Sequence, residues 1–205
     1  MTTSSLLHAQ LEAHSFEAPR PLPGNPRLGK RLFTETLRDA PNAHRRWYTA
    51  RRETDGALLG PVRIVFNYLT IYACKHLPSL TLKRSIFRLL GMKLGKNVTI
   101  ASGVTMDYFF PELIEIGDNT IVGMDAMILT HEFLHDRLRS GRVRIGSGVL
   151  VGAQSMLLAG VTIGNGVRIS AMSLVHKSVP DQCFVGGNPL CLLGRVATGS
   201  VQDGA

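Results

Sequence analysis

The feature that most constrains this chain is a six-residue repeat that runs from Leu94 to Val175. In its second half an aliphatic residue recurs at every sixth position: Ile145, Val151, Leu157, Ile163, Ile169 and Val175. In the first half the same period is carried by Leu94, Ile100, Met106, Ile116, Val122 and Ile128. A small residue, often glycine, follows many of these positions.

An α-helix cannot bury this repeat. With about 100° of rotation per residue, a helix would place every sixth side chain on a different face. In an extended chain six is a multiple of two, so these aliphatic side chains all point to one side. Short strands joined by glycine-containing corners would then stack as parallel coils, each burying its aliphatic residues against the next. The sequence therefore predicts a mainly β fold, a hexapeptide solenoid of the β-helix type.

The repeat is interrupted twice, and the interruptions are where we expect function. Between Met106 and Ile116 the spacing is longer than six residues, and the extra residues include Phe109 and Phe110. Residues 131–142 contain no unit of the repeat. Insertions in a solenoid loop out onto one face, which is often the binding face. We therefore expect one protruding loop at 131–142, with the chemistry close to it.

The flanking segments divide the chain further. We expect a basic, flexible or partly helical arm at 1–57, a helical cap at 58–92, the β-helix domain at 93–193 and a C-terminal tail at 194–205. Within the cap, the alternation of apolar and basic residues from Leu80 to Leu90 predicts an amphipathic helix.

The helical cap has two interpretations. It covers the open first coil of the solenoid, or its residues 61–92 make a peripheral contact with an anionic membrane. The apolar stretch from Pro61 to Cys74 is too short to span a bilayer.

Composition limits the partners and the compartment. The formal charge of +8 suits nucleic acid, an anionic membrane surface or a phosphate-bearing cofactor. No nucleic-acid-binding module accompanies that charge, so we expect no nucleic-acid partner. Cys74, Cys183 and Cys191 lack metal-ligand spacing, and no secretory signal opens the sequence, so we expect buried thiols in a cytoplasmic protein.

Several phrases resemble one family, the hexapeptide-repeat acyltransferases, in the branch of the maltose and galactoside O-acetyltransferases. They are IGDNTIVGMDAMILTHEF (116–133), GVTIGNGVRIS (160–170), HKSVP (176–180) and GGNP (186–189), within a similarity that covers about residues 80–193. The resemblance implies a left-handed parallel β-helix and a homotrimer with active sites between subunits. It also implies acetyl-CoA as the acyl donor, with no metal required.

The chemistry of such a transfer needs a proton acceptor. An acceptor hydroxyl is a poor nucleophile, and a neutral imidazole, with an ordinary pKa of about 6.5, can take its proton as the oxygen attacks. His131 opens the looped segment and matches the family's catalytic histidine. His135 is the second candidate. Glu132 and Asp136 either orient the imidazole or remain solvated.

By the same resemblance, the donor site includes residues of the later coils. Amides near Ala153 and Ala171 would hold the pantetheine arm of the donor. Lys177, beside His176, would lie near its phosphates. Arg195 would substitute for an arginine that relatives carry after the closing proline, where this chain has Leu190 and Cys191. The alternative for each residue is an ordinary corner or surface position.

On the acceptor side, Asp107 falls near an asparagine with which sugar-acetylating relatives contact their acceptor. Its carboxylate would accept hydrogen bonds from a sugar hydroxyl, while Tyr108, Phe109 and Phe110 would form an apolar platform. The alternative is that these residues only pack the insertion.

The leading hypothesis is thus a CoA-dependent O-acetyltransferase that acts on a saccharide or another small hydroxyl compound. One alternative is a zinc hydratase of the gamma carbonic anhydrase type, with His131, His135 and His176 as candidate ligands. Another is a non-catalytic trimeric scaffold whose basic arm docks on partners or on a membrane.

Overall fold

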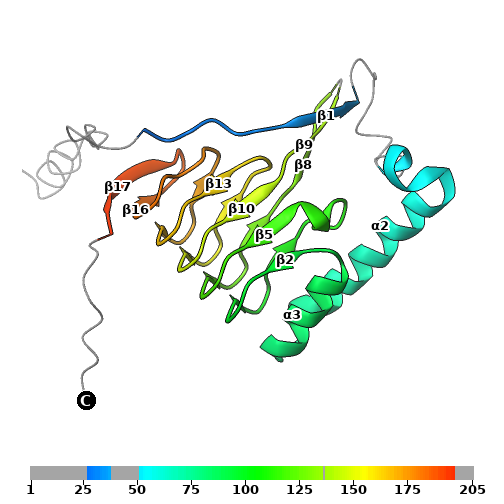
Figure 1. The fold of residues 1–205 in the computed structure, drawn as a ribbon, viewed down its shortest axis with the longest axis horizontal. Coiled ribbons are helices and arrows are strands. Elements are labelled where there is room, and N and C mark those ends of the chain that lie inside the picture. The colour runs from blue at the N-terminus through cyan, green and yellow to red at the C-terminus, as the bar shows by residue number, and fades with distance from the viewer. Residues whose placement is uncertain (1–26, 38–50, 136, 197–205) are drawn as a thin grey trace, which may run out of the picture.

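Each six-residue unit of the repeat forms one short strand and one corner, and three units make one coil of a prism (Figure 1). We describe residues 27–37, 51–135 and 137–196 of a computed structural model. Residues 1–26 and 38–50 of the predicted arm and 197–205 of the predicted tail lie outside the described residues.

The prism has three sides, each a sheet of parallel strands from successive coils. The first sheet contains β2 (Lys93–Leu94), β5 (Ile114–Ile116), β10 (Val143–Ile145) and β13 (Thr162–Ile163). The second contains β3 (Thr99–Ile100), β6 (Ile121–Val122), β11 (Leu150–Val151), β14 (Arg168–Ile169) and β16 (Cys183–Gly186), with β17 (Cys191–Arg195) added antiparallel at its edge. The third contains β4 (Thr105–Met106), β7 (Met127–Ile128), β12 (Met156–Leu157) and β15 (Leu174–Val175).

The aliphatic residues of the repeat form the core, as the sequence predicts. Val122 pairs with Val151, which pairs in turn with Ile169, so equivalent side chains stack from coil to coil. All three are at most 1% exposed. Burying one such side chain contributes about 1.5–3 kcal/mol, and a shift of register by one residue would turn the whole ladder to solvent. The ladder therefore fixes the register of the coils.

Some corner glycines are required because a side chain would not fit there, and not only because of their backbone torsion angles. A Cβ on Gly152 would lie 2.3 Å from the nitrogen of Ala171, because successive coils stack too closely there for a side chain. The left-handed corner positions, by contrast, accept other residues, among them Asn119 (φ 54°) and Met172 (φ 57°). Close stacking is thus what requires glycine at Gly152.

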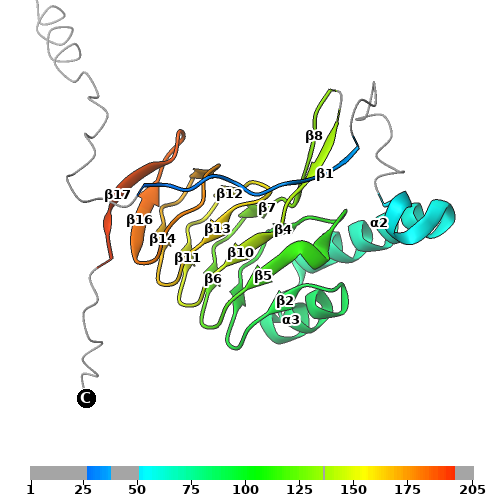
Figure 2. The ribbon, with the colours of Figure 1, turned by 45° about the horizontal axis from the view of Figure 1, so that its top comes forward.

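The two interruptions of the repeat leave the prism at the edge between the third and first sheets. The first contains the 3-10 helix η2 (Pro111–Leu113). The second is an antiparallel hairpin, β8 (His131–Phe133) and β9 (Leu138–Ser140), where the sequence predicts only a loop. It stands out from the prism (Figure 2). The alternation of buried and half-buried residues in β9 agrees with a paired strand.

Residues 27–37, here called the strap, run back along this edge of the prism (Figures 1 and 2). Gly29 forms an antiparallel bridge with Ser178 of the last coils, and the amide of Leu32 donates to the carbonyl oxygen of Gly160 at 2.9 Å. At its other end β1 (Thr34–Leu37) pairs antiparallel with β9. The described part of the predicted arm is therefore extended where it meets the coils.

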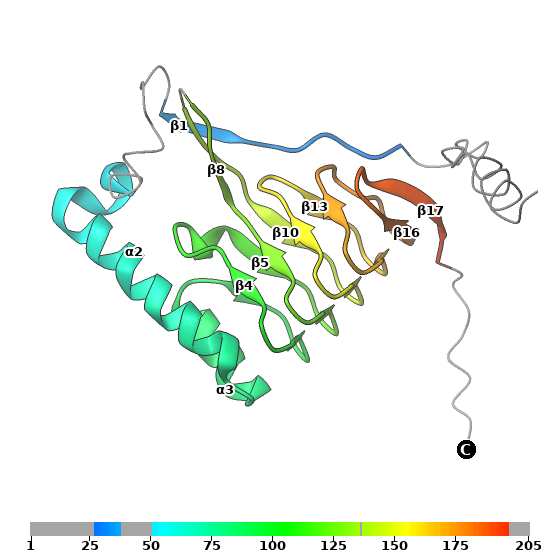
Figure 3. The same ribbon diagram turned by 180° about the vertical axis from the view of Figure 1, so that it is seen from behind.

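Two helices lie at the end of the prism where the coils begin, opposite β16 and β17 (Figure 3). α2 (Arg52–His76) is broken at Gly56 and packs on β4, while α3 (Leu80–Leu89) packs on β2 and β3. Phe87 of α3 is fully buried in the same core as the repeat. This arrangement closes the first coil. No helix among the described residues is long and apolar enough to cross a membrane.

Candidate active site

The candidate site forms where two successive coils leave the third sheet. Met106 of β4 pairs with Ile128 of β7, so the residues that follow these strands lie one above the other. Asp107 follows β4 directly, and His131 opens β8 just beyond β7. Their side chains meet: Nδ1 of His131 lies 2.5 Å from Oδ2 of Asp107.

Asp107 is an ionised carboxylate inside the protein. Its side chain has no exposed surface. Its oxygens accept hydrogen bonds from the backbone amides of Phe109 (2.7 Å), Phe110 (3.2 Å) and Thr130 (2.8 Å), as well as from His131. Burial by itself would raise the pKa of Asp107, but the bond and the charge of His131, together with backbone amides, hold that pKa below its ordinary value.

This contact orients the imidazole. A carboxylate that accepts a hydrogen bond at Nδ1 holds a proton on that nitrogen and directs Nε2 away from the carboxylate. The ring is 13% exposed. It packs against Phe109 and Phe133, with ring centroids 4.4 and 5.1 Å away. The imidazole of His131 is therefore fixed in orientation and partly exposed.

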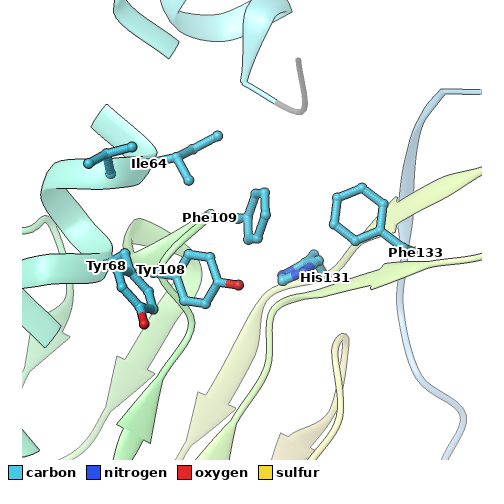
Figure 4. A pocket seen from close by; sticks show the side chains of 7 residues that line it. Ile64, Tyr68, Tyr108, Phe109, His131 and Phe133 are labelled. Atoms are coloured by element: carbon cyan, nitrogen blue, oxygen red, sulfur yellow. The ribbon is translucent and has the colours of Figure 1, made fainter. Parts of the chain in front are cut away.

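The imidazole lines a cavity of about 450 Å³. α2 supplies Ile64 and Tyr68 on one side, the hairpin supplies Phe133 on the other, and Tyr108, Phe109 and His131 lie between them (Figure 4). Val65 completes the lining. The walls are thus largely aromatic and aliphatic, with the imidazole and two phenols as polar groups.

Tyr108 is a neutral donor in this cavity. Its pKa is raised, first by burial and then by the nearby charge of Asp107. Its phenol therefore stays protonated at neutral pH. Its ring meets that of Tyr68 edge to face at 5.4 Å. The sequence predicts an acceptor contact for Tyr108, and the structure puts this residue in the cavity wall.

Buried polar groups hold the insertion that carries these aromatic residues. Arg51 is 2% exposed, and its Nη1 donates to the carbonyl oxygen of Phe109 at 2.5 Å and to Oε1 of Glu112 at 2.7 Å. Nδ2 of Asn67 donates to the carbonyl oxygen of Tyr108 at 2.9 Å. The cap thereby positions one wall of the cavity.

Two carboxylates have partners that the sequence does not predict. Asp107 is not among the residues that line the cavity, and its oxygens accept the hydrogen bonds described above. Glu132 also has partners other than the imidazole. Its carboxylate pairs with Arg31 of the strap and lies 3.8 Å from Nη2 of Arg139. His135 is exposed at the hairpin, and Asp136 lies outside the described residues.

Four of the five residues expected at the donor site fall on two edges of the prism. Ala153 and Ala171 are exposed neighbours at the edge between the second and third sheets, where the amide of Met172 donates to the carbonyl oxygen of Ala153 at 2.9 Å. His176 and Lys177 follow β15 and so lie on the same edge as His131, two coils further along.

The side chains of the second pair differ in exposure. Lys177 is exposed, whereas His176 is half-buried and has Nδ1 3.1 Å from the carbonyl oxygen of Leu174. Arg195 is exposed on β17 at the far end of the prism.

Several site residues escape sequence reasoning. The pairing of Asp107 with His131 had a signal, because both follow strands that stack in one sheet of the solenoid. Ile64, Val65 and Tyr68 have no such signal, since only the packing of α2 across β4 brings them to the cavity. Arg51 looks like one of several arginines in a basic segment.

Comparisons with known proteins identify the family. A family model for bacterial transferase hexapeptides (six repeats) matches residues 142–177. A Bacillus subtilis protein named "putative acetyltransferase YvoF" is 43% identical over 133 residues, which cover 64% of this chain and 77% of that protein. The chain belongs to the hexapeptide-repeat acyltransferases. A Staphylococcus aureus relative, "putative acetyltransferase SAS0727", is also 43% identical, over 62% of this chain and 80% of its own length.

Solved structures support the fold of this acyltransferase. The hexapeptide-repeat acetyltransferase VCA0836 from Vibrio cholerae, in complex with acetyl coenzyme A, matches 69% of this chain and 92% of its own, with a TM-score of 0.57 and 19% identity. A galactoside acetyltransferase in complex with coenzyme A matches 73% of this chain and 91% of its own, with a TM-score of 0.53 and 22% identity. The coil is therefore the left-handed parallel β-helix.

Proposed function

We propose that this acyltransferase moves an acetyl group from acetyl-CoA to a hydroxyl group of a saccharide or another small acceptor. His131 acts as the general base, and Asp107 is its positioning residue. One observation carries the proposal: the hydrogen bond between Asp107 and Nδ1 of His131, in the wall of a cavity large enough for a small acceptor.

The geometry supports the following reaction. Nε2 of His131 accepts the proton of the acceptor hydroxyl while its oxygen attacks the thioester carbonyl carbon. The tetrahedral intermediate then collapses, the carbon–sulfur bond breaks, and the leaving thiolate takes the proton back from the imidazolium. Asp107 stabilises the imidazolium while it exists and keeps the ring in one tautomer.

The cavity favours a ring-shaped acceptor with hydroxyl groups. Aromatic rings from Tyr68, Tyr108, Phe109 and Phe133 can stack on the apolar face of a sugar, and the two phenols can hydrogen-bond its hydroxyls. Its described lining contains no arginine or lysine. This composition supports a neutral saccharide over an anionic acceptor.

The donor assignment is supported by the structural relatives that hold acetyl coenzyme A or coenzyme A. In this proposal Ala153 and Ala171 contact the pantetheine arm, while His176, Lys177 and Arg195 lie toward the phosphates. Within one chain the third sheet separates the two alanines from His131. A homotrimer in which the alanine edge of one subunit faces His131 of the next would bring them together.

The function is tested by a screen of sugars, lipid-linked sugars and amines with acetyl-CoA, in which release of the CoA thiol is measured. We expect a hydroxyl compound with a sugar ring to raise thiol release well above the rate with acetyl-CoA alone. Response to amines only would replace O-transfer with N-transfer. No response across the panel, with acetyl-CoA bound, would contradict a saccharide acceptor.

Lys177→Gln tests the donor site. Loss of one exposed charge near a phosphate should raise KM for acetyl-CoA about fivefold with little change in kcat, because about 1 kcal/mol of binding is lost. With 3′-dephospho-acetyl-CoA the variant and the unsubstituted enzyme should have the same KM. Lys96→Gln, at an exposed corner of the first coil, is the control. An equal KM increase with both donors would remove Lys177 from the 3′-phosphate site.

The hydratase alternative gains no support from the structure. No group of three histidine, cysteine, aspartate or glutamate side chains within residues 27–37, 51–135 and 137–196 is arranged to hold a metal ion.

A further inference from the structure

The outer surface of the two helices is unusually apolar for an exposed cap. Large apolar side chains of α2 and α3 turn away from the prism, and six of them define what we call the apolar cap face: Leu58, Val62, Phe66, Leu69, Leu82 and Leu89. The exposed fraction is 61% for Phe66 and 87% for Leu89. Such contiguous apolar surface marks a docking site, because leaving it in water is costly.

The charge around this face is mainly positive, although Asp55 lies beside Val62, Phe66 and Leu89. Between Gly56 and Met106 the sequence contains no aspartate or glutamate. The same stretch places Arg63, Lys75, Arg84 and Arg88 on the two helices, all with side chains at least partly exposed. Asp55, the acidic residue of α2 that precedes this stretch, forms ion pairs with Arg51 and Arg63. Apolar residues flanked by positive charge are the pattern of a surface that binds anionic lipid.

The apolar cap face is also continuous with the active-site cavity. Val65 and Tyr68 are each 48% exposed on α2, beside Phe66 and Leu69, and both line the cavity of His131. A bilayer against the cap would therefore lie at the mouth of the cavity.

We infer that the apolar cap face docks on an anionic lipid surface, as a peripheral contact. The apolar side chains enter the interfacial region, and the basic side chains remain with the headgroups. A second copy of the chain fits less well, because pairing two such faces would bring like charges together. The docking does not depend on the proposed reaction, although it would place the cavity where a lipid-linked acceptor is presented.

The test is flotation of the full-length protein with vesicles, without acetyl-CoA. We expect binding to vesicles of phosphatidylcholine with phosphatidylglycerol, and at least tenfold weaker binding to phosphatidylcholine alone. Phe66→Gln with Leu69→Gln should abolish flotation. Lys75→Gln with Arg84→Gln should weaken binding about 30-fold, since each basic residue contributes about fivefold.

Matched controls come from surfaces away from the cap. Leu193→Gln, a half-exposed apolar position on β17, and Arg168→Gln, an exposed position on β14, should float like the unsubstituted protein. Thermal melting confirms that each variant is folded. The inference is overturned if the unsubstituted protein does not float, if all variants float equally, or if the glutamine variants at Phe66 and Leu69 instead dissociate an oligomer. His131→Ala should float normally, which separates docking from catalysis.

Discussion

Replacement of His131 by alanine is expected to lower kcat by about 10²–10⁴-fold while the affinity for acetyl-CoA stays within about twofold. In the proposed reaction the imidazole in the cavity wall accepts the proton, and general-base catalysis contributes an effect of this size. The measurement is thiol release with the best acceptor from the screen, alongside calorimetric binding of acetyl-CoA. The acid limb of the profile of kcat/KM against pH, which reports the essential base, should disappear in the variant.

Two further results would decide the interpretation of that experiment. His135→Ala, at the exposed part of the hairpin, should retain activity within about twofold and so separate the two histidines that the sequence offers. If His131→Ala releases thiol as fast as the unsubstituted enzyme with a responsive acceptor, the base is elsewhere. That result would favour the hypothesis of a non-catalytic trimeric scaffold.

Asp107→Asn is expected to lower kcat by about 10²–10³-fold with a smaller change in KM. An amide can donate to Nδ1 of His131, which then carries its proton on Nε2 and can no longer accept one from the acceptor. Separate measurement of kcat and KM, together with the pH profile, distinguishes a loss of positioning from simple unfolding. A variant that is folded and fully active would contradict the assignment.

Stability gives an independent check on the same residue. The folded-state pKa of Asp107 is below the unfolded value, so its contribution to stability is fully present above an unfolded pKa of about 3.9. That contribution is lost as the pH falls through the lower folded pKa. The melting temperature of Asp107→Asn should therefore fall below that of the unsubstituted protein at neutral pH, and the gap should narrow in acid. Asp118→Asn, whose Oδ1 accepts from the amide of Lys96 at an exposed corner, should show a smaller difference at neutral pH.

The sequence predicts the solenoid well because its period is a local property. Each aliphatic residue at the sixth position must point inward once the chain is extended, and residues such as Val151 and Leu157 are fully buried as a result. The helix predicted from Leu80 likewise matches α3, although Lys83 is buried and Leu82 and Leu89 are exposed. The spacing and polarity of neighbouring residues predict that this helix forms, but not which side chains it buries.

The parts that sequence reasoning misses depend on contacts between distant segments. Strand β9 of the hairpin pairs on its outer side with β1 of the strap, which lies about a hundred residues earlier in the sequence. The burial of Asp107 depends on how two coils stack, which the spacing of the repeat does not reveal. The lining of the cavity by Val65 and Tyr68 follows from the crossing of α2 over the prism. Periodicity carries no information on these tertiary contacts.

The strap also imposes an order on how the molecule can be assembled. During synthesis each new coil can pair with the one just completed, so most of the prism can grow outward from the cap through near-neighbour contacts. Residue Gly29 leaves the ribosome early, yet its bridge partner Ser178 belongs to the last coils. The Gly29 end of the strap must therefore wait for almost the entire solenoid before it can dock, whereas β1 at the other end can pair with β9 before the later coils are made.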